Sequence, residues 1–165
     1  MPNRAAPNAR ALWALAGLLI AALVAVALYR GWPLLFPQAK RMAPLDPRCD
    51  LRAGPCTARF PGGGTVRLAI APPAIPVARP LTLRVESAGL APRAVEVDFS
   101  GTDMDMGFNR VSLSRTPSGV YEGRAMLPIC VRAQMEWEAK VMLHMPDGLW
   151  VAPFRFETSR AERYR

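Results

Sequence analysis

The sequence has 165 residues, with 21 Lys and Arg against 13 Asp and Glu, and a formal net charge of +8 at pH 7. This length accommodates one domain beside a membrane anchor. The basic residues are scattered, and no basic helix or alternation of basic with aromatic residues is predicted, which argues against a nucleic-acid-binding protein.

An uncharged apolar stretch occupies residues 11–29, between Arg10 and Arg30. As a helix it would cross roughly 30 Å of hydrocarbon. Aromatic residues that favour the headgroup region lie near its two ends: Trp13, Tyr29 and Trp32. We therefore predict a transmembrane helix over 11–29, preceded by a cytoplasmic leader at 1–10.

Two alternatives compete with this anchor. A cleaved signal peptide needs small residues after a shorter apolar region, whereas this stretch ends in Tyr29-Arg30-Gly31-Trp32-Pro33. A buried core helix normally carries a polar face, and this stretch is apolar all round.

The orientation of the anchor is predicted from the cysteines, because basic residues flank the span almost equally and the positive-inside rule does not decide. Cys49 and Cys56 lie close together in a turn-rich segment. In an oxidising compartment the pair predicts a disulfide. In a reducing compartment it would indicate a metal or redox pair, but the spacing is not the C-x-x-C of such pairs. We favour the disulfide, which predicts a single-pass protein of a bacterial inner membrane with a periplasmic C-terminal domain.

The pattern changes after residue 64. Residues 30–64 are rich in Pro, Gly and Arg and are predicted to form a linker. From Thr65 onward, apolar and polar residues alternate between turn sequences, with the period of two that is typical of half-buried strands. The strands are expected at 65–70, 81–86, 95–100, 108–113, 120–127, 135–143 and 149–156.

About seven short strands with regular turns predict a mainly β fold, an immunoglobulin-like antiparallel β-sandwich over 65–157. The last two strands are expected to form a hairpin across residues 145–148. Aromatic side chains are expected in the core: Phe99, Trp137, Trp150, Phe154 and Phe156. A basic tail at 158–165 completes the chain.

Catalytic motifs are scarce. His144 is the only histidine, no serine lies in a G-x-S-x-G elbow, and no phosphate loop or dinucleotide fingerprint is present. We therefore expect a protein that is not an enzyme.

Sulfur ligands are the more informative chemistry. Met104 and Met106 are two residues apart, so in an extended backbone their thioethers share one face. Such a pair suits Cu(I). Cys130, the thiol left over from the disulfide, and Met135 are further candidate metal ligands, and His144 is a possible nitrogen donor.

Each of these residues has an alternative interpretation. Methionine commonly fills cores, so Met135 can be buried, and Cys130 can be a small buried hydrophobe. Asp103 and Asp105 suit a calcium ion by their oxygen ligands, although the rest of an EF-hand loop is missing. They can equally pair with Arg110 or, together with Arg110, bind a partner.

Four segments carry a resemblance to a known group: Asp-Met-Asp-Met-Gly-Phe-Asn-Arg (103–110), Val-Tyr-Glu-Gly (120–123), Leu-Pro-Ile-Cys (127–130) and Met-Glu-Trp-Glu-Ala (135–139). They resemble the FixH-like and YtkA-like proteins of proteobacteria. The resemblance implies an N-terminal anchor, a small periplasmic β-sandwich, and a role in copper delivery or haem–copper oxidase assembly. The Cys-x-x-x-Cys motif of Sco-type chaperones and the His/Met pattern of periplasmic Cu(I) chaperones are absent.

Two functions follow as expectations. The first is a membrane-anchored periplasmic accessory protein that holds Cu(I) transiently for copper handling or oxidase assembly. The second is an interaction module of a membrane complex that binds its partner without metal, through a sandwich edge or the 103–110 loop.

Overall fold

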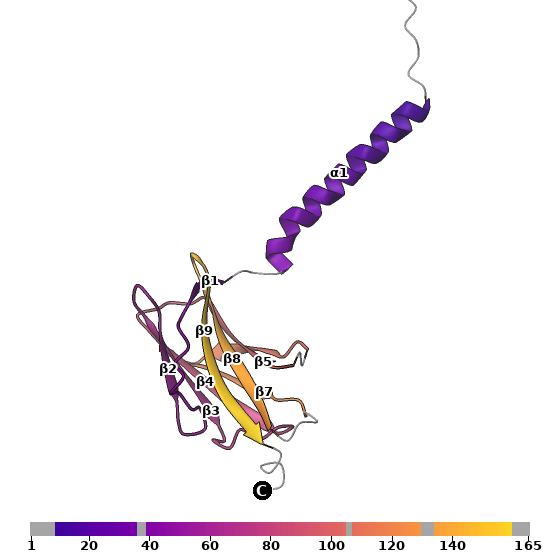
Figure 1. Cartoon of the computed structure of the whole chain (residues 1–165). Coiled ribbons are helices and arrows are strands. Elements are labelled where there is room, and N and C mark those ends of the chain that lie inside the picture. The colour runs from indigo at the N-terminus through magenta and orange to yellow at the C-terminus, as the bar shows by residue number, and fades with distance from the viewer. Residues whose placement is uncertain (1–8, 36–38, 105–106, 130–133, 160–165) are drawn as a thin grey trace, which may run out of the picture. The chain divides into compact units, whose positions relative to one another are not determined.

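The computed structural model describes residues 9–35, 39–104, 107–129 and 134–159 (Figure 1). The chain divides into two compact units, Met1–Gln38 and Ala39–Arg165. The first unit contains α1 (Ala9–Leu35). Its span Ala9–Gly31 is long and apolar enough to cross a membrane, and none of it is buried in the described structure. The lack of burial argues against a core helix.

The second unit, here called the β unit, contains nine strands within its described residues. They are β1 (Ala39–Met42), β2 (Cys56–Arg59), β3 (Thr65–Ala71), β4 (Pro80–Ala88), β5 (Ala94–Gly101), β6 (Arg110–Arg115), β7 (Tyr121–Met126), β8 (Gln134–Met145) and β9 (Gly148–Ser159). The seven predicted strands are thus confirmed, with shifted ends.

The predicted domain boundaries need correction. The linker prediction for 30–64 is wrong from Ala39 onward, because β1 and β2 belong to the β unit. Both strands have only four residues. All four residues of β1 are exposed, whereas those of β2 alternate between buried and exposed. At the other end β9 continues to Ser159, two residues into the predicted tail.

The strand order is β1-β9-β8-β5-β6-β7-β4-β3-β2. We call β1, β9, β8 and β5 sheet A, and β7, β4, β3 and β2 sheet B. β6 pairs with β5 through residues 110–113 and with β7 through Ser114 and Arg115, so it passes from one sheet to the other. All pairs are antiparallel except β1 with β9.

This topology is that of an immunoglobulin-like sandwich, because consecutive strands cross between the sheets from β4 to β5 and from β7 to β8. The alternating residues of both sheets supply the core, in which Trp137, Phe99 and Leu83 are almost completely buried. Phe99 meets Phe156 edge-to-face at 6.3 Å between ring centroids. Burying a side chain of this kind contributes about 1.5–3 kcal/mol, so the predicted aromatic core stabilises the fold.

The two ends of the sandwich carry different connections. At one end, which we call the hairpin end, β8 turns into β9 and β1 pairs with the first residues of β9. At the other, which we call the loop end, Gly101 pairs with Trp137 near the start of β8, and Pro80 pairs with Met126. The connections 102–109 and 127–129 therefore both lie at the loop end.

Candidate functional site

The 102–109 connection is anchored on both sides of the loop end. Thr102 donates from its backbone N to the Glu136 carbonyl oxygen (3.1 Å) and from Oγ1 to Glu136 Oε2 (2.8 Å). Asn109 donates from Nδ2 to the Met126 carbonyl oxygen (3.2 Å). The connection is thus fastened to the start of β8 and to the end of β7.

Two residues predicted as sulfur ligands approach Gly101, the last residue of β5: Met135 with its side chain and Met104 with its backbone. A Cβ at this position would meet the Met135 Cε and, at 2.6 Å, the Met104 carbonyl oxygen. Met135 is 8% exposed on the inner side of β8, as expected for a core residue. Met104 is half-buried and packs against the same core. Glycine is needed here because the Met135 side chain and the backbone of 104 approach so closely.

Three predicted site residues, Asp105, Met106 and Cys130, lie outside the described residues. Within the described part of the chain, no group of three or more His, Cys, Asp or Glu residues is placed to hold a metal ion.

Arg110 has a partner that the sequence did not identify. Its Nε lies 3.6 Å from Asp98 Oδ1, and its guanidinium stacks 5.0 Å from the ring centroid of Phe108. The Nε atom is buried and makes no hydrogen bond. Asp103 is exposed. Arg110 is therefore held between β5 and the 102–109 connection.

The loop end also displays large apolar side chains. Phe108 is 81% exposed, Ile129 58% and Met126 52%, and we call these three residues the apolar loop patch. In the described part of the β unit, Met42 is the other exposed large hydrophobic residue. The Asn109 bond holds the chain next to Phe108 against Met126. Only a weak signal in the sequence marks this patch. Phe108 directly follows Gly107 and Ile129 directly follows Pro128, and the alternation of apolar and polar residues is interrupted at both places.

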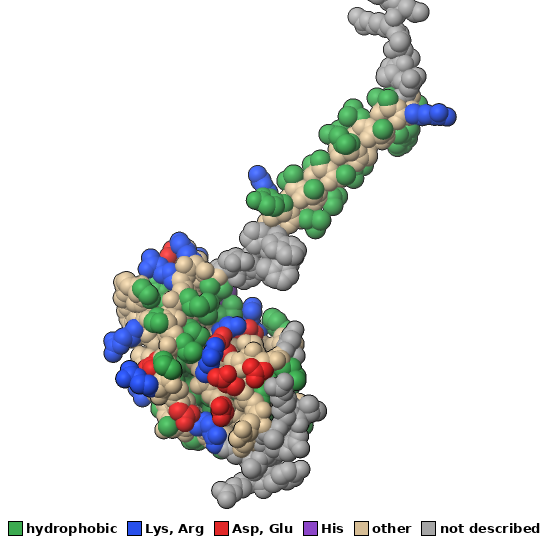
Figure 2. Space-filling view, in the orientation of Figure 1, with side chains coloured by type: hydrophobic (Ala, Val, Ile, Leu, Met, Phe, Trp, Pro, Cys, Tyr) green, Lys and Arg blue, Asp and Glu red, His purple; other side chains and the backbone are tan. Residues whose placement is uncertain are grey.

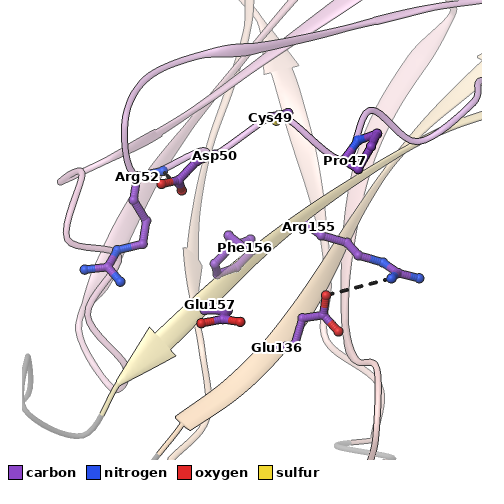
Figure 3. A pocket seen from close by; sticks show the side chains of 8 residues that line it. All are labelled: Pro47, Cys49, Asp50, Arg52, Glu136, Arg155, Phe156 and Glu157. Atoms are coloured by element: carbon purple, nitrogen blue, oxygen red, sulfur yellow. Dashed lines mark hydrogen bonds and ion pairs between the residues drawn. The ribbon is translucent and has the colours of Figure 1, made fainter.

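A polar hollow of about 270 Å³ adjoins the loop end through Glu136 (Figure 3). Pro47, Cys49, Asp50 and Arg52 line one side of the hollow. Glu136 of β8 and the β9 residues Arg155, Phe156 and Glu157 line the other. Arg155 lies 3.8 Å from Glu136 and donates to Glu138 at 3.2 Å. Figure 2 shows acidic and basic side chains mixed on the face over β8 and β9. Three carboxylates, Asp50, Glu136 and Glu157, and two arginines, Arg52 and Arg155, line the hollow, so its charges are of both signs.

The predicted disulfide borders this hollow. Cys49 and Cys56 are bonded, with their Cα atoms 5.8 Å apart. The bond ties the segment after β1 to the first residue of β2. It thereby fixes one wall of the hollow beside β9.

The comparisons do not identify a relative. The chain matches no protein-family model, and neither the curated proteins nor the solved structures compared with it give a match. The site is therefore interpreted from its own residues.

Proposed function

We propose that this protein is a membrane-anchored periplasmic accessory protein whose β unit docks a subunit of a membrane complex through the apolar loop patch. One observation carries the proposal: Phe108, Met126 and Ile129 are exposed together at one end of the sandwich. Large exposed apolar side chains gathered at one end of a domain are typical of interaction sites.

The surroundings of the patch support docking. Aromatic and methionine side chains are enriched in interface cores, and polar residues form the rim. Phe108 is the aromatic anchor and stacks against Arg110, while exposed Asp103 supplies rim polarity. Removing the three apolar side chains from water on binding contributes on the order of 1.5–3 kcal/mol for each that becomes fully buried.

Site-specific photo-crosslinking in membranes of the source cells tests this function. A benzophenone amino acid replaces Phe108 in one variant and exposed Thr82, on the outer face of sheet B, in a matched control. We expect a discrete crosslink to one membrane-complex subunit from position 108 and none from 82. Met126→Glu should remove it. No crosslink at 108, or equal crosslinks at both positions, would contradict the docking proposal.

A second candidate function is transient Cu(I) binding at the loop end. The observation that favours it is the anchoring of the 102–109 connection to Met126 and to Glu136, on either side of Cys130 in the chain. Met104 is the one of these candidate ligands that the structure describes at this end. Its thioether, together with the thioether of Met106 and the thiolate of Cys130, would be a ligand set that suits Cu(I). Met135 lies in the core beside Gly101. It would act as a fourth ligand only if its sulfur bound the ion from the core side. A protein that holds Cu(I) would deliver it to a client protein in oxidase assembly, the role that the FixH-like resemblance implies.

Competition with a chromogenic Cu(I) chelator tests the copper function on the full chain in neutral detergent. Met104→Leu/Met106→Leu should weaken Cu(I) binding at least about tenfold, because soft thioether ligands are lost. Met42→Leu/Met145→Leu removes two methionines from the hairpin end and should bind like the unmodified protein. Equally weak binding by all three proteins would sink the copper function and leave docking unaffected.

A further inference from the structure

The hairpin end contains a hollow of a different chemical character from the one beside the loop end. It measures about 550 Å³ and lies between the β4–β5 connection and the β6–β7 turn. Two arginines, Arg93 and Arg115, and the hydroxyl residues Ser87, Ser118 and Tyr121 contribute to its lining. None of the described residues that line it is acidic.

The charges of these two arginines are uncompensated within the described structure, which pairs neither of them with a carboxylate. Two other cations of the same end have partners. Lys40 Nζ lies 3.5 Å from Asp147 Oδ2, and the Arg41 guanidinium lies 4.6 Å above the Trp150 ring. Arg93 and Arg115 are both exposed. The hollow is therefore a local concentration of free positive charge.

Hydrogen bonds hold both walls of the hollow in place. On one wall, Tyr121 donates from its hydroxyl to the Pro92 carbonyl oxygen, and Arg93 N donates to the His144 carbonyl oxygen, both over 2.9 Å. On the other wall, Thr116 N donates to Val120 O (2.7 Å) and Gly119 N to Thr116 O (2.9 Å). Because these backbones are fixed, little ordering is needed before a ligand binds.

Arginine and hydroxyl donors together favour a phosphate group. Guanidinium groups present paired N–H donors that match phosphate oxygens, and serine hydroxyls add further donors. The position of the hollow favours a lipid as the source. Only three residues of the chain separate α1, which ends at Leu35, from β1, which starts at this same end of the sandwich.

We propose that this hollow binds the headgroup phosphate of an anionic phospholipid of the membrane that α1 spans. The inference rests on the membrane anchor of the proposed function but not on the apolar loop patch. Basic residues close to a membrane surface attract anionic lipids, and each contributes to binding.

Native mass spectrometry of the full chain in neutral detergent tests the site with added phosphatidylglycerol, and with phosphatidylcholine as the zwitterionic reference. Arg93→Ser/Arg115→Ser should weaken retention of phosphatidylglycerol about tenfold or more, because each arginine beside an anionic headgroup adds a several-fold factor. The control, Arg67→Ser/Arg124→Ser, removes the same charge from exposed positions on the outer face of sheet B and should retain the lipid.

Three outcomes would overturn the proposal. Equal retention by all variants would show that the hollow binds no headgroup, and equal losses in both double variants would show binding by overall charge. Titration with inorganic phosphate distinguishes the ligand source: binding of free phosphate by the hollow with no preference for phosphatidylglycerol over phosphatidylcholine would reject the lipid. None of these outcomes affects crosslinking at Phe108, so docking is judged separately.

Discussion

The indole Nε1 of Trp137 donates a 3.0 Å hydrogen bond to Thr158 Oγ1 inside the core. Both residues are buried, and their strands are paired in sheet A. The bond satisfies the polar atom of the largest fully buried side chain. It also explains a threonine on an inner face that is otherwise apolar.

We expect Thr158→Val to lower the free energy of unfolding by about 1–3 kcal/mol, because the buried indole N–H loses its acceptor. Thr158→Ser keeps an acceptor and should recover most of that stability. Urea unfolding of the full chain in neutral detergent, followed by tryptophan fluorescence, measures both. Unchanged stability in Thr158→Val would mean that another acceptor satisfies the indole.

Gly101→Ala should destabilise the β unit by about 1–3 kcal/mol through overpacking, because the added methyl meets Met135 Cε and the Met104 carbonyl oxygen. The 102–109 connection must then move, so the crosslink from Phe108 should weaken. Gly54→Ala is the control, because a Cβ there meets nothing within 4 Å. Equal unfolding midpoints for the two variants would contradict the close approach at Gly101.

Removing the disulfide by Cys49→Ser/Cys56→Ser should cost about 2–3 kcal/mol, since the bond closes a short loop in the unfolded chain. Urea unfolding under non-reducing conditions measures the loss. Peptide mass mapping without reductant should find Cys49 bonded to Cys56 and Cys130 outside the bridge. A bridge that includes Cys130 would overturn both the pairing and the copper hypothesis.

Glu96 should make stability depend on pH in the acidic range. Burial by itself raises the pKa of this carboxyl. Hydrogen bonds from His144 (2.8 Å) and Ser112 (3.2 Å), with the charges of His144 and Arg110, outweigh burial and hold the pKa below its ordinary value of 4.5. A carboxyl whose pKa is lower in the folded state stabilises the fold above its unfolded pKa, and that stability is lost as pH falls through the folded pKa.

The stability difference between the unmodified protein and Glu96→Gln should therefore be largest above pH 4.5 and shrink as the pH falls below it. Urea unfolding at a series of pH values from 6 to 3 measures the difference. A gap that stays constant across this series would mean that the Glu96 charge does not stabilise the fold.

Alkaline phosphatase fused after Arg165 should be active, because the enzyme needs disulfides that form outside the cytoplasm. A green fluorescent protein at the same position, exported by the same route, should stay dark. The reverse pattern would put the β unit in the cytoplasm. Both the disulfide argument for orientation and the periplasmic function would then fall.

The sequence by itself determined the apolar span and the strands from β3 to β9. The span is read from composition alone, and Val66, Leu68 and Ile70 of β3 alternate because one face of a strand must be buried. The Cys49–Cys56 pair was also readable, because the two residues are close in the chain. These features depend on local periodicity and spacing.

Only the tertiary structure decided which connections meet. Asn109 reaches Met126, Thr102 reaches Glu136, and Arg93 shares a hollow with Arg115. β1 was not predicted because all of its side chains are exposed, so its sequence shows no alternation of apolar and polar residues. It belongs to the sheet through its backbone pairing with β9. Which connections come into contact depends on the order of the strands in the two sheets. That order produces no periodic pattern of residues in the sequence.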